Sequence, residues 1–348
     1  MREPPLPGVP GEDAWTPPHG ASELTLRTGL WLVQLGPVLV LVVLWIAMSS
    51  LSDVFFTGRN ITNLGVQASI VATLAIGQLI VIVTRGIDLS VGSVLSLATV
   101  TGGLVYDAAA LSSGLPVAVT MVLTGAAVGL LNGVIYVKGR IPHPFIVTLA
   151  TFYAARGLAL VLTDGASLPG MPPLVQDAGA GFVGDIPWPV IVVAVIGAVA
   201  FVLMKWTRWG RWIYAVGGSP EAAKRAGIPV SRVLISAYVL CGVGAGLAGL
   251  ITAGRTNSGF PTAGNLAELD AIAAVTIGGA SFFGGRGNVG NAIVGALILA
   301  TIRNGMNLLA VSPFWQLLVI GTVILIAVEL DVTRSGIEER LRMVAAKG

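Results

Sequence analysis

Long apolar runs separated by short polar segments extend along almost the whole chain. The runs are continuous, without a two-residue alternation, and most are 18 to 23 residues long. A helix of that length crosses the roughly 30 Å hydrocarbon core of a bilayer, whereas a barrel strand would alternate apolar and polar residues. The pattern therefore predicts an all-α, polytopic membrane protein with about ten transmembrane helices. The predicted spans are residues 30–50, 62–83, 89–106, 115–137, 144–163, 188–206, 233–253, 268–283, 289–310 and 313–330.

The eighth predicted span, residues 268–283, is shorter than the others and begins with the acids Glu268 and Asp270. A full crossing needs about 20 predominantly apolar residues. Two interpretations of this segment therefore stay open, a complete crossing and a half-helix that ends inside the membrane.

Charge placement predicts which side of the membrane each loop occupies. Cytoplasmic loops carry an excess of Lys and Arg. With ten spans and the N-terminus inside, both termini are cytoplasmic, sixteen basic residues fall inside, and only Arg59 and Arg255 fall outside. The inside residues are Arg2, Arg27, Arg85, Lys138, Arg140, Lys205, Arg208, Arg211, Lys224, Arg225, Arg232, Arg286, Arg334, Arg340, Arg342 and Lys347. A missed or invented span would scramble this division.

The tails and the longest interior loop complete the predicted organisation. Residues 1–28 are interpreted as a disordered cytoplasmic tail, because they are proline-rich and lack the basic start and apolar core of a signal peptide. Residues 29–331 form the predicted transmembrane domain, and residues 332–348 a cytoplasmic C-terminal tail. The longest interior cytoplasmic loop is residues 207–232.

Composition narrows the possible functions only a little further. Apolar residues make up 55% of the chain, charged residues 11%, and the mean hydropathy is +0.87. The single cysteine, Cys241, excludes an intramolecular disulfide. The basic residues are dispersed over loops, so the net charge of +3 does not indicate a nucleic-acid partner.

The stretch KWTRWGRW at residues 205–212 marks a membrane boundary. Three tryptophans and three cations alternate here, as is typical of the headgroup level, where aromatic rings and basic side chains both find suitable surroundings. An interfacial anchor and a specific lipid or ligand site are the two interpretations.

The stretch EAAKRAG, residues 221–227, carries the signals of a complete short helix. Ser219 suits the N-cap and Pro220 the first helical position. Gly227 suits a left-handed terminating position, and Pro229 follows as a stop. A helix of two turns is unstable alone in water, so either the rest of the protein or a partner must hold it.

The pattern E-A-A-x-x-x-G formed by these residues resembles the EAA loop of bacterial ABC-importer permeases. Two longer stretches, GIDLSVGSVLSLATVTGG at residues 86–103 and residues 268–316, resemble the ribose, xylose and galactose branch of that family. Arg85 stands where the branch has glycine or another small residue. The likeness covers residues 58–331.

The resemblance implies roles and partners that composition does not show. Glu221, Ala222, Ala223, Lys224 and Gly227 would form a coupling helix that docks on a cytoplasmic ABC ATPase. The chain would bind no cofactor, because ATP and Mg²⁺ would be held by that ATPase. A second permease copy, an extracytoplasmic sugar-binding protein and membrane lipid are the other expected partners, in a bacterial inner membrane.

Polar side chains inside the spans are candidates for a substrate pathway, because each is costly in hydrocarbon. Neutral amides suit a sugar, whose hydroxyls both donate and accept hydrogen bonds. Gln78, Asn132 and Asn304 are the predicted pathway residues, with hydrogen bonding between helices as the competing interpretation. Arg156 and Arg303 also lie within spans and have no obvious acidic partner in the sequence.

The resulting hypothesis is a permease subunit that imports a monosaccharide or related polyol by alternating access. The chain has no P-loop, no cluster of zinc ligands and no plausible catalytic triad, so no catalytic or metal-binding residue is predicted. The alternative is an ion-coupled transporter or a channel, which requires titratable groups within the membrane. The acids lie at span ends, which favours the first hypothesis.

Overall fold

The computed structural model describes residues 23–109 and 113–345 of the chain, which divides into two units, residues 1–36 and 37–348. Most of the described part is helical, as the apolar runs predict. Its helices are α1 (Glu23–Leu51), α2 (Gly58–Val83), α3 (Val91–Ala109), α4 (Leu115–Lys138), α5 (Pro144–Val161), α6 (Pro173–Ala180), α7 (Trp188–Trp206), α8 (Arg208–Gly218), α9 (Pro220–Arg225), α10 (Val230–Thr256), α11 (Ala267–Ile277), α12 (Val289–Leu308) and α13 (Pro313–Ala345). Most of the predicted N-terminal tail lies outside the described residues.

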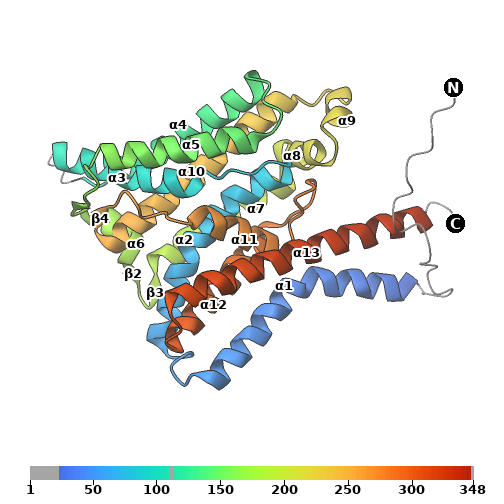
Figure 1. The fold of residues 1–348 in the computed structure, drawn as a ribbon, viewed down its shortest axis with the longest axis horizontal. Coiled ribbons are helices and arrows are strands. Elements are labelled where there is room, and N and C mark those ends of the chain that lie inside the picture. Colours follow the sequence, from blue (N-terminus) through green and yellow to red (C-terminus); the bar gives the residue numbers. More distant parts are fainter. Residues whose placement is uncertain (1–22, 110–112, 346–348) are drawn as a thin grey trace. The chain divides into compact units, whose positions relative to one another are not determined.

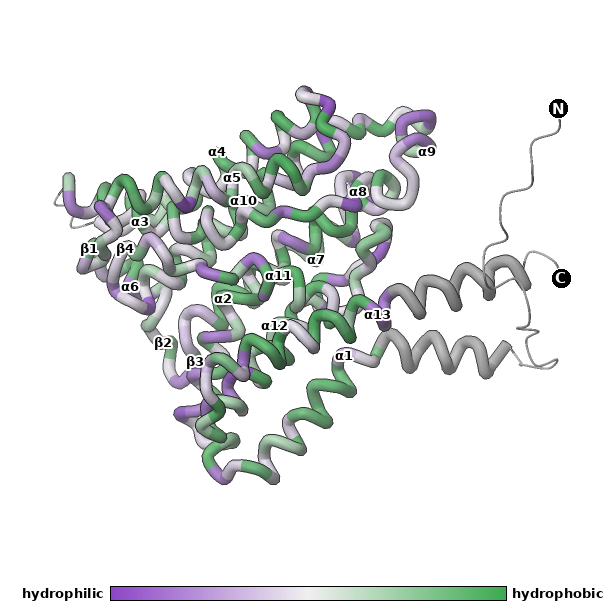
Figure 2. The backbone as a smooth tube through the Cα atoms, in the orientation of Figure 1, coloured by the Kyte–Doolittle hydropathy of each residue, from purple (hydrophilic) through white to green (hydrophobic). Residues whose placement is uncertain are grey.

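The larger unit is built around α2, α3 and α10, whose side chains are largely buried. Helix α4 packs along α10 and α5 packs against α3, while α11 and α12 pack against α2 (Figure 1). Hydrophobic residues dominate these long helices, whereas the short α9 is mostly hydrophilic (Figure 2). The arrangement is that of a helical bundle whose apolar outer surface suits lipid.

Helices α4 and α10 approach each other through glycines. A Cβ atom on Gly129 would lie 2.2 Å from the carbonyl oxygen of Tyr238, and one on Gly242 would lie 2.1 Å from that of Gly125. No side chain fits at such distances, so glycine is what allows the two backbones to touch. The glycines of α4 therefore form its packing face against α10.

Replacing Gly242 by Ala is expected to lower the thermal unfolding temperature of the purified protein, because the helices must separate to admit the methyl group. Overpacking of this kind costs about 1–3 kcal/mol. The control is Gly157→Ala on α5, where an added Cβ meets no atom within 4 Å. That variant should be neutral or slightly more stable, since Ala favours a helix. Equal unfolding temperatures for the two variants in detergent would contradict the close crossing.

The structure distinguishes long spans from a short one. Seven helices of the described residues are long and apolar enough to cross a membrane, namely α2, α3, α4, α5, α7, α10 and α12. In the same residues, α1 and α13 add shorter apolar stretches, Leu35–Leu51 and Pro313–Glu329. Helix α11 has only 11 residues, about 17 Å of rise, so the half-helix is the interpretation that the structure favours for residues 268–283. The total of about ten crossings stays a prediction.

Two loops that are distant in the sequence form one surface at the end of the bundle opposite α9 (Figure 1). Strand β1 (Leu168–Pro169) pairs with β4 (Ser258–Gly259), and the backbone N–H of Met171 donates to Oδ1 of Asn257 at 2.8 Å. Strands β2 (Phe182–Val183) and β3 (Ile186–Pro187) form a hairpin beside them. The loop between α5 and α7 is thereby fixed to the end of α10.

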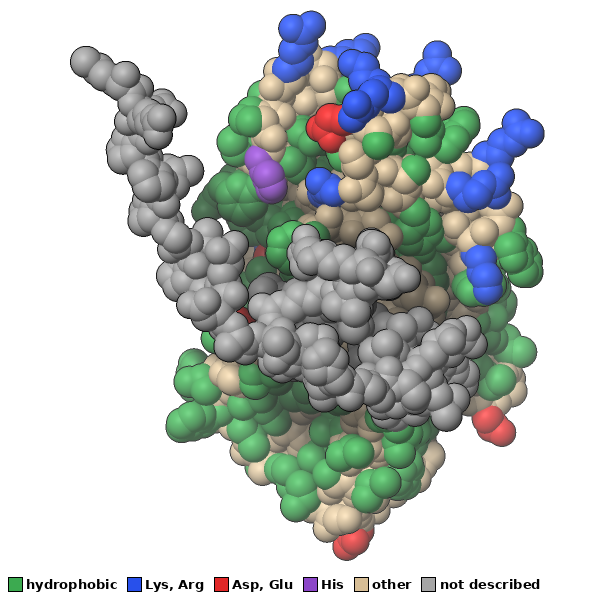
Figure 3. Space-filling view, turned by 90° about the vertical axis from the view of Figure 1, so that its right-hand side faces the viewer, with side chains coloured by type: hydrophobic (Ala, Val, Ile, Leu, Met, Phe, Trp, Pro, Cys, Tyr) green, Lys and Arg blue, Asp and Glu red, His purple; other side chains and the backbone are tan. Residues whose placement is uncertain are grey.

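The face on which α8 and α9 lie is rich in basic side chains. Figure 3 looks onto this face and shows Lys and Arg side chains gathered over its upper part, with few acids among them. Lys138, Lys205, Arg211, Lys224 and Arg232 are all exposed. An excess of exposed cations is typical of the cytoplasmic side of a membrane protein.

Candidate functional site

Helix α9 forms as its sequence predicts. The hydroxyl oxygen of Ser219 accepts a hydrogen bond from the backbone N–H of Ala222 at 3.2 Å, and Pro220 is the first helical residue. Gly227 takes the left-handed conformation, with φ of +80°, and the chain then turns into α10. The cap and the terminating glycine are therefore confirmed.

The predicted coupling residues divide into an exposed set and an anchor. Glu221, Ala222, Lys224 and Gly227 are exposed, whereas Ala223 is only 4% exposed and packs into the core. A small buried residue holds the helix against the bundle while the others face outward. The geometry leaves a surface open to a partner, and docking on an ATPase stays a prediction.

Arg85 connects α9 to the spanning helices. Its Nε donates a hydrogen bond to the carbonyl oxygen of Gly217 at 2.6 Å, and its guanidinium also donates to the carbonyl of Gly218. These carbonyls end α8, immediately before α9. Arg85 itself follows the end of α2 and has φ of +67°, a conformation that favours glycine. The side chain thus ties the end of α2 to the start of the coupling segment.

A third segment reaches the same place. The backbone N–H of Gly285 donates to the carbonyl oxygen of Val83 at 2.8 Å, and the hydroxyl of Tyr214 on α8 donates to the carbonyl of Gly287 at 2.8 Å. The loop between α11 and α12 is therefore joined both to α2 and to α8. The junction therefore joins α8, which immediately precedes α9, to the end of α2 and to the loop before α12.

The structure places Gln78 and Asn132 in one buried network beside this junction. With its amide oriented to satisfy both groups, Gln78 bonds the backbone N–H and C=O of Asp88 at 3.1 Å each. The amide nitrogen of Asn132 donates to Oγ of Ser90 at 2.9 Å, and its oxygen accepts from Thr151 at 2.6 Å. Both amides are at most 1% exposed. Their contacts are those of residues that join helices, and a passage role for them stays a prediction.

Asn304 has a partner of its own kind. Its amide nitrogen donates to Oδ1 of Asn60 at 2.8 Å, and the amide nitrogen of Asn60 donates back to Oδ1 of Asn304 at 3.0 Å. The pair joins α12 to α2 and is buried. Contact of Asn304 with a substrate likewise stays a prediction.

A polar groove lies elsewhere, between α2, α11 and α12 and the end of α10. It has a volume of about 430 Å³. Its polar lining consists of Gln67, Arg255, Asn265, Asp270, Arg303 and Asn307, and aliphatic side chains form the remaining walls. The residues of α2 that line the groove, from Gln67 to Leu74, lie in the middle of that helix, whereas the junction with α8 lies at its end, at Val83.

The groove contains an ion pair that sequence reasoning missed. Arg303 donates to Oδ1 of Asp270 at 2.7 Å, with 32% and 8% of the two side chains exposed. The expectation that Arg303 lacks an acidic partner is therefore wrong. Arg156 packs over the ring of Phe152 and donates a long hydrogen bond, 3.4 Å, to the carbonyl of Gly264. The sequence did contain a signal for this ion pair, because Asp270 and Arg303 carry opposite charges and lie in two consecutive apolar segments.

Comparison with known proteins identifies the chain. Residues 60–328 match the family described as "Branched-chain amino acid transport system / permease component". The chain belongs to this permease family. Relatives that match the permease over most of its length agree with the branch expected from the sequence. No solved structure matches it.

The named relatives are sugar permeases. The ribose import permease protein of Escherichia coli (strain K12) is 41% identical over 311 residues, which cover 87% of this permease and 95% of that protein. The corresponding protein of Bacillus subtilis (strain 168) is 44% identical, with 87% and 94% covered. The D-allose transport system permease protein of Escherichia coli (strain K12) is 38% identical, with 85% and 90% covered. The permease is thus a multi-pass membrane component of a transporter.

Proposed function

We propose that this permease is the transmembrane subunit of an ATP-driven ABC importer that moves a monosaccharide or related polyol into the cytoplasm. The observation that carries the proposal is the exposed, capped helix α9, which directly follows the junction of α8 with the end of α2 and the loop before α12. The relatives of this chain include a ribose import permease and a D-allose transport system permease. An exposed helix of this kind offers a cytoplasmic ATPase a docking site through which its conformational change can move the permease.

The proposed partners occupy opposite faces. An ABC ATPase, which holds ATP and Mg²⁺, docks on Glu221, Ala222, Lys224 and Gly227 on the basic face. A sugar-binding protein docks on the surface formed by residues 164–187 and 255–266, which the pairing of β1 with β4 supports. Both termini are cytoplasmic, in a bacterial inner membrane, and the excess of exposed cations beside α9 supports this orientation.

The groove lined by Asp270 and Arg303 is the proposed entry for the sugar. Carboxylate, guanidinium and amide groups together offer acceptors and donors, which is what vicinal hydroxyls need. A second copy of the permease is the proposed partner within the membrane. Affinity for the sugar resides in the binding protein, so this site needs only weak, transient contacts.

Alternating access follows from the junction at Arg85. Closure of the ATPase on α9 displaces α8, and the hydrogen bonds from Arg85 and to Gly287 transmit the displacement to α2 and to the loop before α12. The groove is lined by the middle of α2 and by the second half of α12. A movement at the cytoplasmic junction thereby changes the groove further along both helices.

Reconstitution tests the function and the orientation together. Proteoliposomes enclose the binding protein and labelled ribose, and the ATPase with MgATP is added outside. Sugar is expected to leave the vesicles only when the binding protein is inside and ATP is outside, because the two partners need opposite faces. Labelled valine in place of sugar is the negative control, because the family's description names branched-chain amino acids. ATP-dependent movement of valine but not sugar, or movement with both partners on one face, would contradict the proposal.

A further inference from the structure

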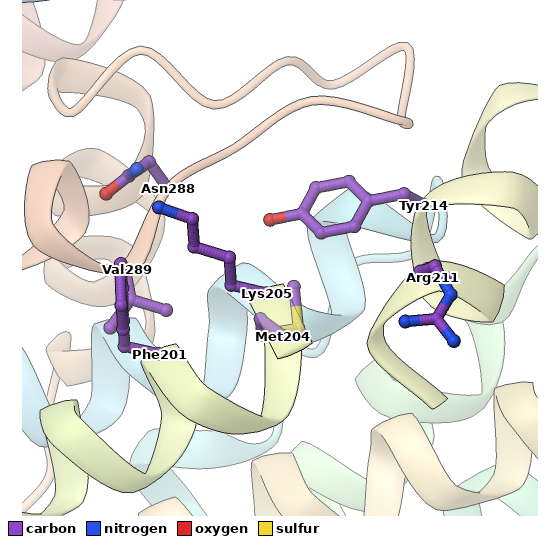
Figure 4. A pocket seen from close by; sticks show the side chains of 7 residues that line it. All are labelled: Phe201, Met204, Lys205, Arg211, Tyr214, Asn288 and Val289. Carbon is purple, nitrogen blue, oxygen red and sulfur yellow. The ribbon is translucent and has the colours of Figure 1, made fainter. Parts of the chain in front are cut away.

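A second cavity lies on the basic side, between α7, α8 and the start of α12. Its volume is about 440 Å³, and Figure 4 shows the residues that line it. They are Phe201, Met204, Lys205, Arg211, Tyr214, Asn288 and Val289. None of these residues lines the sugar groove, so the cavity is a separate site.

The cavity carries uncompensated positive charge. Neither Lys205 nor Arg211 has a carboxylate within ion-pair distance among the residues that the structure describes. The ammonium of Lys205 lies 5.0 Å from the centre of the Phe201 ring, which holds this cation in place. In Figure 4 it lies next to Asn288, and the hydroxyl of Tyr214 points toward the same space. The site therefore attracts an anion.

Neutral groups in the cavity add hydrogen-bond donors. The oxygen of Asn288 already accepts from the backbone N–H groups of Gly290 and Asn291, which leaves its amide nitrogen as a donor for a ligand. Burial raises the pKa of Tyr214, so its hydroxyl stays neutral and keeps donating to the carbonyl of Gly287, which leaves an oxygen lone pair toward the cavity. Two cations and an amide N–H₂ suit the several acceptor oxygens of a phosphate.

The cavity stands at the level of the lipid headgroups. Trp206 follows Lys205 and is 67% exposed, and Trp188 at the other end of α7 is 38% exposed. The side chains of Val195, Val199 and Val202 form an exposed apolar stripe between these ends. Trp rings prefer the two interfaces of a bilayer, so α7 spans it with Lys205 at a boundary. A phosphate in the cavity would have apolar surface of α7 alongside for an acyl chain.

We propose that this cavity binds the phosphate headgroup of an anionic phospholipid. Charge complementarity and the interfacial height favour a lipid over a soluble anion, and the lipid would bridge α7, α8 and the start of α12. Because Tyr214 also bonds the loop before α12, the bound lipid braces the junction on which α9 is seated.

Lipid retention measured by native mass spectrometry tests this assignment. The purified permease is titrated with phosphatidylglycerol or phosphatidylcholine of matched chains, and the variant Lys205→Gln/Arg211→Gln is compared with Lys138→Gln/Arg140→Gln. The control removes two exposed cations of the same basic side outside the cavity. We expect about tenfold weaker retention of phosphatidylglycerol in the cavity variant and little change in the control.

Two further measurements decide the remaining outcomes. Phosphatidylglycerol should raise the thermal unfolding temperature of the unmodified permease more than phosphatidylcholine does. This measurement does not depend on whether any variant folds. Displacement of the lipid by millimolar inorganic phosphate would identify a soluble-anion site and overturn the lipid assignment. Equal retention by the cavity and control variants, or equal stabilisation by the two lipids, would also overturn it. None of these results depends on which sugar is imported.

Discussion

Replacing Glu221 by Lys together with Gly227 by Val is expected to abolish sugar uptake while the permease stays in the membrane at normal levels. The first substitution places a cation at the positive end of α9, at a cost of about 0.3–1 kcal/mol. At Gly227 φ is +80°, which costs a β-branched residue roughly 1–2 kcal/mol. A helix of six residues has little stability to lose, so its outward surface should deform.

The structure supplies matched controls for this experiment. An added Cβ at position 227 meets no atom within 4 Å, so Val acts there through backbone strain rather than through a clash. The single variant Gly227→Asn should therefore keep normal sugar uptake, because Asn tolerates the left-handed region. Glu221→Gln removes the charge without reversing it and should have a small effect.

The decisive measurement is the ratio of ATPase to permease after purification in mild detergent, taken with uptake in the same cells. A lowered ratio with lost uptake supports docking on α9. An unchanged ratio together with normal uptake would show that α9 is only a loop helix, and it would remove the coupling role proposed for it.

Features fixed by neighbours in the sequence were the ones that could be predicted. The cap at Ser219 and the turn at Gly227 each follow from spacing within a few residues. The long spans follow in the same way, since an apolar run of sufficient length has few alternatives in a bilayer.

Features that depend on tertiary partners could not be read from spacing. The hydrogen bonds of Gln78 with Asp88 and of Asn132 with Ser90 join segments that no local pattern connects, and a pathway role for the two amides stays a prediction. The groove forms only where α2 meets three consecutive helices, α10, α11 and α12, that are far from it in the chain, so no local pattern marks it. Arg85 reads as a departure from the family's small residue, and only its contacts with the end of α8 reveal what it does.

Breaking the pair of Asp270 and Arg303 is expected to have the second large effect. Arg303→Leu leaves a carboxylate unpaired in a site where only 8% of its side chain is exposed. Removing one partner of a buried ion pair costs about 3–5 kcal/mol, so the amount of folded permease in the membrane should fall strongly.

The double variant Asp270→Asn/Arg303→Gln separates folding from transport. Two amides keep a hydrogen bond between α11 and α12 without leaving a charge unpaired, so membrane levels should recover. Uptake per permease molecule should still be at least about tenfold below the unmodified protein, because hydrogen bonds to charged groups contribute about 1.5–3 kcal/mol each. The measurement is initial uptake rate divided by permease in the membrane, with ATPase co-purification as the check on assembly. Full recovery of uptake per molecule would show that the pair only joins two helices, and the route of the sugar would then lie outside this groove.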